Sequence, residues 1–124
     1  PHLLHPENFY AVCRTDENDY LLEIREKFAF HEDKTQDRHS VGMYYFRSGQ
    51  LLKHYYRQQL AEDLNLNGEY YASLTYNLLV RDGLNVLVYD KVHHFCQWGT
   101  PFDLEEYRYW SEIFEGLAQS PEGH

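Results

Sequence analysis

The spacing of the apolar residues changes along this chain from every second position to every third or fourth, and that change constrains the fold more than any other feature. Apolar and polar residues alternate over 8–15 and again over 20–25, with the turn-forming cluster Asp16–Asp19 between them. This pattern predicts a β-hairpin. Over 49–63 and 69–82 the apolar residues recur at helical spacing, which predicts two consecutive helices.

The remaining segments complete the expected order of elements. Residues 28–39 are dense in charge and have no period, which predicts a mobile surface loop. Runs of apolar, β-branched and aromatic residues over 40–46 and 84–92 predict two more strands, the second extended as far as Trp98. A last helix is expected over 101–116. Together these elements predict an α/β fold, a mixed sheet with flanking helices, in the order β-β-loop-β-α-α-β-α.

Composition and charge limit the classes of partner. The 124 residues include 43% hydrophobic side chains, which is enough for one packed domain over 1–121, and the closing Glu122–His124 resembles a tag remnant. The net charge of -9 would repel a phosphate backbone, so we expect no nucleic-acid partner. The sequence has no run of about 18 apolar residues and only two cysteines. We therefore expect no membrane partner and a cytoplasmic location.

The spacing of the glycines excludes the common phosphate-binding loops. No two of the seven glycines are closer than seven positions, so neither Gly-x-Gly-x-x-Gly nor the P-loop pattern occurs. The sequence also lacks the HExxH, CxxC and GxSxG patterns. A nucleotide triphosphate would therefore need a phosphate-binding loop from outside this chain.

Three potential metal ligands lie near the C-terminus, but their arrangement on a strand does not favour a metal site. His93, His94 and Cys96 lie close together in the sequence, but on a strand His93 would point to one face and the other two to the opposite face. A structural zinc site needs about four ligands, and no second pair at fixed spacing is present. We therefore expect no metal site here.

Four segments stand out by their order and spacing across about 100 residues: Glu23–Lys27 (EIREK), Ser40–Phe46 (SVGMYYF), Asn67–Tyr71 (NGEYY) and Phe95–Leu104 (FCQWGTPFDL). Taken together they resemble the second half of the sugar-phosphate nucleotidyltransferases, the family that makes nucleotide-activated sugars and related compounds. The family's other half is a nucleotide-binding fold with a glycine-rich loop and catalytic Arg and Lys, and nothing in this sequence matches it.

The resemblance implies a set of substrate-binding residues. Glu26 would accept hydrogen bonds from acceptor hydroxyls, and Lys27 would hold the acceptor phosphate. Gly42 would let the pocket wall approach the ligand closely. Glu69, expected at a helix start, would face the same pocket. The residue pattern alone favours a different interpretation, in which Glu26 and Lys27 are a solvated charge pair at a strand end.

The family motif departs from its usual form at Gln97, where many members carry an aspartate that helps to bind the divalent ion. A neutral amide is a poor Mg²⁺ ligand compared with a carboxylate, so Mg²⁺ is expected in the complete enzyme but not on this chain. Strand alternation would direct Gln97 toward the acceptor pocket and Trp98 toward the core.

The implied function is transfer of a nucleotidyl group from an NTP to a sugar phosphate or similar phosphorylated alcohol, with release of pyrophosphate. The NTP would bind through the other half, and this chain alone would be inactive. An alternative is a non-catalytic binding or oligomer-assembly module that retains the half-fold. The aromatic side chains of the last helix, such as Trp110 and Phe114, would give a homo-oligomer an apolar contact surface.

Overall fold

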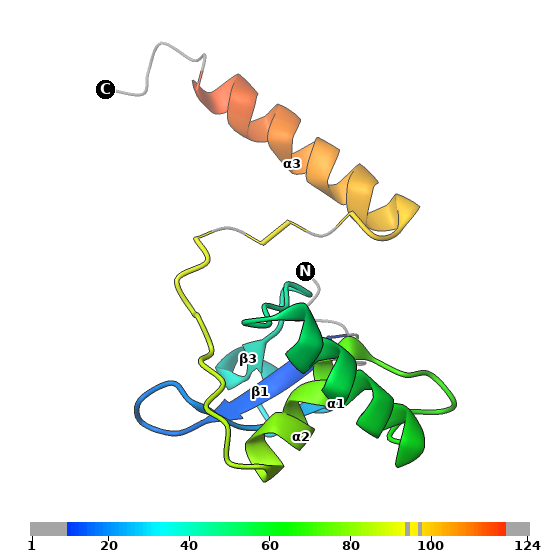
Figure 1. The fold of residues 1–124 in the computed structure, drawn as a ribbon. Coiled ribbons are helices and arrows are strands. Elements are labelled where there is room, and N and C mark those ends of the chain that lie inside the picture. Colours follow the sequence, from blue (N-terminus) through cyan, green and yellow to red (C-terminus); the bar gives the residue numbers. More distant parts are fainter. Residues whose placement is uncertain (1–9, 94, 97, 119–124) are drawn as a thin grey trace. The chain divides into compact units, whose positions relative to one another are not determined.

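The computed structural model describes residues 10–93, 95–96 and 98–118, and within them it shows a mixed α/β chain with a small sheet and three α-helices (Figure 1). The chain divides into two compact units between Lys91 and Val92. In the described part of the chain, none of the helices combines the length and the apolar character needed to cross a membrane.

The predicted hairpin is confirmed. Strand β1 (Ala11–Thr15) pairs antiparallel with β2 (Leu21–Glu26), and Cys13 lies opposite Ile24. The turn between them is fixed by Asp16, whose carboxylate accepts 2.9 Å hydrogen bonds from the backbone N–H groups of Asn18 and Tyr20. Such an Asx-type turn is what the Asp-rich cluster favours.

The segment predicted as an irregular mobile loop is instead held in place and completes the sheet. It contains a 3₁₀ turn, η2 (Lys34–Gln36), and the short strand β3 (Arg38–His39), which pairs with β1 to give the sheet order β2-β1-β3. The buried carboxylate of Asp37 accepts a 3.0 Å hydrogen bond from the Phe30 backbone N–H and contacts His31 Nδ1 at 2.6 Å. Sequence periodicity did not reveal these anchors because they come from side chains.

The two further strands predicted over 40–46 and 84–92 are absent from the structure. Residues 40–46 are irregular, and Gly42 has a φ of +78°, which interrupts an extended ladder. Residues 86–88 only touch the hairpin turn, through backbone bonds from Leu21 N to the Val86 carbonyl (2.8 Å) and from Val88 N to the Asp19 carbonyl (2.9 Å). Their apolar residues pack on the core without forming a regular strand.

The first predicted helix is confirmed as α1 (Gly49–Ala61), whose first turn is capped by the Ser48 hydroxyl. The second begins later than predicted: a 3₁₀ turn, η3 (Ala72–Leu74), leads into α2 (Thr75–Arg81), and 69–71 are not helical. Helices and sheet enclose a core of mainly apolar side chains. The buried members of that core are Ala11, Leu21, Ile24, Tyr55, Tyr76, Leu78 and Leu79.

The buried amide of Gln59 on α1 links the first helix to the segment before the second. Gln59 has no exposed surface, and its Nε2 donates to the backbone carbonyls of Leu64 (3.1 Å) and Tyr71 (3.0 Å). Its Oε1 accepts from the Thr75 hydroxyl at 2.6 Å. The Tyr71 carbonyl also accepts from the Leu74 N–H at 3.2 Å, so Gln59 anchors the residue at which η3 begins.

The second unit contains the predicted C-terminal helix, α3 (Pro101–Ala118). Thr100 and Asp103 cap each other's backbone: Asp103 N donates to the Thr100 hydroxyl (3.2 Å), and Thr100 N donates to the Asp103 carboxylate (3.0 Å). Trp98 is 59% exposed and makes an edge-to-face contact with Tyr107. The prediction that Trp98 packs in the core was therefore wrong, and the described residues 92–93, 95–96 and 98–100 form no strand that would turn the ring inward.

Candidate functional site

Polar side chains from three parts of the first unit gather at one end of the sheet. Glu26, the last residue of β2, lies opposite Ala11 at the start of β1. On the other side of β1, the Ser40 backbone N–H donates to the Ala11 carbonyl at 2.8 Å. Glu26 and Ser40 thus flank the same residue of the central strand, and their side chains share the sheet face that carries the helices.

The carboxylate of Glu26 is oriented by the turn before α2. Ser73 in η3 is only 1% exposed, and its hydroxyl donates a hydrogen bond to Glu26. The position of this turn is fixed by Asn77, whose side chain accepts from Ile24 N (2.9 Å) and donates to the Ile24 carbonyl (2.8 Å). Asn77 therefore holds α2 against β2, and this keeps Ser73 beside Glu26.

Lys27 leaves the strand in a left-handed conformation, with a φ of +51°, and its backbone N–H still donates to the Tyr10 carbonyl at 3.2 Å. Its ammonium lies 5.7 Å from the centre of the Tyr71 ring, and the Tyr71 hydroxyl donates to the Glu69 carboxylate. Interaction with the Tyr71 side chain, followed by the charges of Glu69 and Glu26, raises the pKa of Lys27. Lys27 is therefore a cation at every physiological pH.

The irregular segment after β3 supplies two hydroxyls. The Ser40 hydroxyl donates to the Tyr44 phenol oxygen at 3.0 Å and accepts from the Gly42 backbone N–H at 3.1 Å. Burial raises the pKa of Tyr44, and the charge of Glu26 raises it further, against opposing hydrogen bonds from Ser40 and Ser73. Tyr44 therefore remains a neutral phenol next to Glu26.

Gly42 itself owes its identity to conformation. A Cβ at Gly42 would meet no atom within 4 Å, so the position lies open beside the described chain. Its φ of +78° is a conformation that side chains disfavour, and this is the physical reason for a glycine.

We call this group of side chains the sheet-end cluster. The structure brings three of the five predicted site residues into it, with Gly42 joined through Ser40, while Gln97 lies outside the described residues. Sequence reasoning missed Ser40, Tyr44, Tyr71 and Ser73 as site residues. The members of the cluster are Glu26, Lys27, Ser40, Tyr44, Glu69, Tyr71 and Ser73.

Potential metal ligands do not converge in the described part of the chain, where no group of three or more His, Cys, Asp or Glu side chains could hold an ion. His93 and Cys96 are exposed, and His94 lies outside the described residues. The sheet-end cluster instead combines one cation, two carboxylates and four hydroxyls.

No family model, no curated protein and no solved structure matches this chain. The chemistry of the sheet-end cluster is therefore the basis of the functional proposal.

Proposed function

We propose that this chain is the acceptor-binding half of a nucleotidyltransferase that acts on a sugar phosphate or a similar phosphorylated alcohol. The observation that supports it is that Lys27, next to Glu26 at one end of the sheet, lies 5.7 Å from the ring of Tyr71, whose hydroxyl donates to Glu69 about forty positions away in the sequence. The sequence resemblance assigned Glu26, Lys27 and Glu69 to the acceptor pocket. The finer fold expectation, one half of a nucleotide-diphospho-sugar transferase-like domain, is part of this proposal.

The side chains suit an acceptor that is both anionic and rich in hydroxyls. Lys27 neutralises an acceptor phosphate, and a charged hydrogen bond to it is stronger than a neutral one. Glu26 accepts from a sugar hydroxyl, and the bond from Ser73 keeps its carboxylate in one orientation. The neutral phenol of Tyr44 offers a further hydroxyl next to Glu26.

In the proposed reaction an oxygen of the acceptor phosphate attacks the α-phosphorus of the NTP, the bond to the β-phosphate oxygen breaks, and pyrophosphate leaves. Catalysis of this kind depends mainly on positioning and charge neutralisation. The role of this chain is to position the acceptor. The NTP and its Mg²⁺ bind to the complementary half, because the described residues offer no fitting set of metal ligands and no phosphate loop occurs in the sequence.

The test replaces Lys27 in a protein that carries both halves. Lys27→Ala should lower kcat/KM for the acceptor by about tenfold or more, since a charged hydrogen bond contributes about 1.5–3 kcal/mol. The KM for the NTP should not change. Lys91→Ala, which removes an exposed cation outside the cluster, is the matched control. If kcat/KM for the acceptor is the same in the variant and the parent, Lys27 is a solvated surface charge with no part in acceptor binding.

A non-catalytic assembly module is the second candidate, and the apolar surface of α3 favours it. Phe102 and Phe114 are each 64% exposed and Trp110 is 46% exposed. Sedimentation of the purified chain separates the two functions. A stable oligomer, together with a two-half protein that does not respond to Lys27→Ala, would favour assembly.

A further inference from the structure

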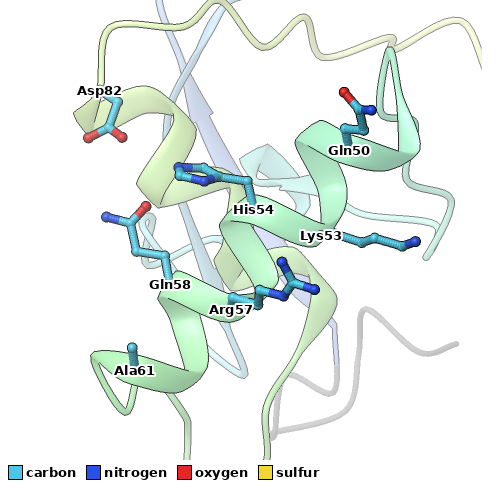
Figure 2. Close-up of a pocket in the computed structure, with 7 residues that line it drawn as sticks. All are labelled: Gln50, Lys53, His54, Arg57, Gln58, Ala61 and Asp82. Carbon is cyan, nitrogen blue, oxygen red and sulfur yellow. The ribbon is translucent and has the colours of Figure 1, made fainter.

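A second polar surface lies on helix α1, away from the residues of the sheet-end cluster. Side chains three and four positions apart line one side of the helix, where they border a hollow of about 560 Å³ (Figure 2). The C-terminal end of α2 closes it on one side. The side chains that line the hollow include Gln50, Lys53, His54, Arg57, Gln58 and Asp82.

The hollow holds cations that lack a carboxylate partner. Lys53 and Arg57 lie one turn apart, and among the described residues neither forms an ion pair. Arg14, Arg25, Arg38 and Arg81 are paired; Arg38, for example, contacts Asp19 at 2.5 Å. In a chain of net charge -9, two unpaired cations in one hollow form a local positive region.

Asp82, which lines the hollow, and Glu62 share one cationic partner, Arg81, which does not line it. Arg81 binds both oxygens of Glu62, at 2.7 and 3.0 Å, and also contacts Asp82 at 3.4 Å. The Tyr55 hydroxyl donates to Asp82 at 3.1 Å. The pKa of Glu62 is lowered mainly by its hydrogen bond to Arg81. Lys53 and Arg57 therefore remain available to an external anion.

Neutral groups that suit a polar ligand complete the lining. The side chains of Gln50, His54 and Gln58 surround the two cations along α1 (Figure 2). Amide and imidazole N–H groups donate hydrogen bonds to oxyanions, as do ammonium and guanidinium groups. The Gln58 Nε2 already donates to Glu62 at 3.0 Å, so Gln50 and His54 are the neutral groups with donors left for a ligand.

From this lining we propose that the α1 hollow binds a small oxyanion of the phosphate class through Lys53 and Arg57. The site goes beyond the proposed acceptor site, with which it shares no residue. It gives the chain a second place at which phosphate-bearing compounds or released pyrophosphate bind.

The experiment titrates the full chain with inorganic pyrophosphate and follows its backbone amides by NMR at constant ionic strength. Saturable shifts should centre on 50–58, and the double substitution Lys53→Gln, Arg57→Gln should weaken binding by about tenfold or more. Arg47→Gln removes one exposed charge from the residue before the Ser48 cap and outside the hollow, and it should leave the affinity within about twofold.

Three outcomes would overturn the proposal. The first is the absence of a saturable amide shift at millimolar pyrophosphate, and the second is an amide shift confined to the sheet-end cluster. The third is a loss of affinity with Arg47→Gln as large as that with the double substitution. Lys27→Ala separates the two sites. Pyrophosphate binding at α1 should survive this substitution, so the α1 site can be confirmed even if the acceptor function fails. The acceptor function can likewise be confirmed even if no pyrophosphate binds at α1.

Discussion

Replacing Gln59 should destabilise the first unit more than any other single change to a polar side chain of α1. Gln59 is fully buried and makes three hydrogen bonds, to the Leu64 and Tyr71 carbonyls and from the Thr75 hydroxyl, at 2.6–3.1 Å. Gln59→Leu keeps the volume but removes the partner of the Leu64 carbonyl and of the buried Thr75 hydroxyl, and leaves the Tyr71 carbonyl with only its 3.2 Å bond from Leu74 N. A buried group that loses its partner costs about 1–3 kcal/mol, so we expect a loss of about 3 kcal/mol or more.

Gln59→Ala should lose a further 1–2 kcal/mol or so, because the substitution also leaves a cavity. These losses are a large share of the roughly 5–15 kcal/mol that stabilises a typical domain. The measurement is urea denaturation at 25 °C followed by circular dichroism. Gln58→Ala is the matched control: the same substitution one position along removes only an exposed bond to Glu62, and should change stability by less than about 0.5 kcal/mol. A Gln59→Leu variant within about 1 kcal/mol of the parent would refute the role assigned to this amide.

Two further predictions concern Trp98 and Cys13. Trp98→Ala should cost less than about 1 kcal/mol in the same denaturation assay, against about 3–5 kcal/mol for a buried aromatic, because the indole is 59% exposed; a larger loss would mean that the ring packs on something. Burial raises the pKa of Cys13 from 9.0 to about 11, so a thiol reagent at pH 8 should modify exposed Cys96 quickly and Cys13 only after unfolding. The folded-state pKa is the higher one, so the stability gained by keeping this thiol neutral is intact below pH 9 and is lost as the pH rises toward 11; equal reactivity of the two thiols would contradict this.

The sequence predicted best those elements whose cause is local. The hairpin follows from alternation and the Asp16 turn, and α3 begins where Thr100 and Asp103 cap each other. The spacing of apolar residues did not predict the secondary structure where side chains from distant parts of the sequence hold the backbone. Gln59 anchors the Tyr71 carbonyl, just before η3, to α1, and Asp37 anchors a segment that by composition suits a loop.

In the candidate site, too, some features could be predicted from local sequence and others depend on contacts between distant residues. Glu26, Lys27 and Glu69 were named from segments that resemble a family, and their mutual placement depends on pairing that no local pattern reveals. Tyr71 and Ser73 were missed because 69–82 was interpreted as one helix. Residues 69–71 are not helical, so Glu69 and Tyr71 fall on one side of the chain, and Ser73 follows in the 3₁₀ turn η3.

The contact between Asn77 and Ile24 also determines where this sheet can grow. Strand β2 is an edge strand in the order β2-β1-β3, and an open edge is a template on which another strand can add. Asn77 occupies the outward N–H and C=O of Ile24, and the Val86 carbonyl occupies the N–H of Leu21. A strand arriving from a companion domain or a second copy would have to displace α2 to pair there. Extension of the sheet is therefore directed to the β3 side, and the β2 side is protected against edge-to-edge aggregation.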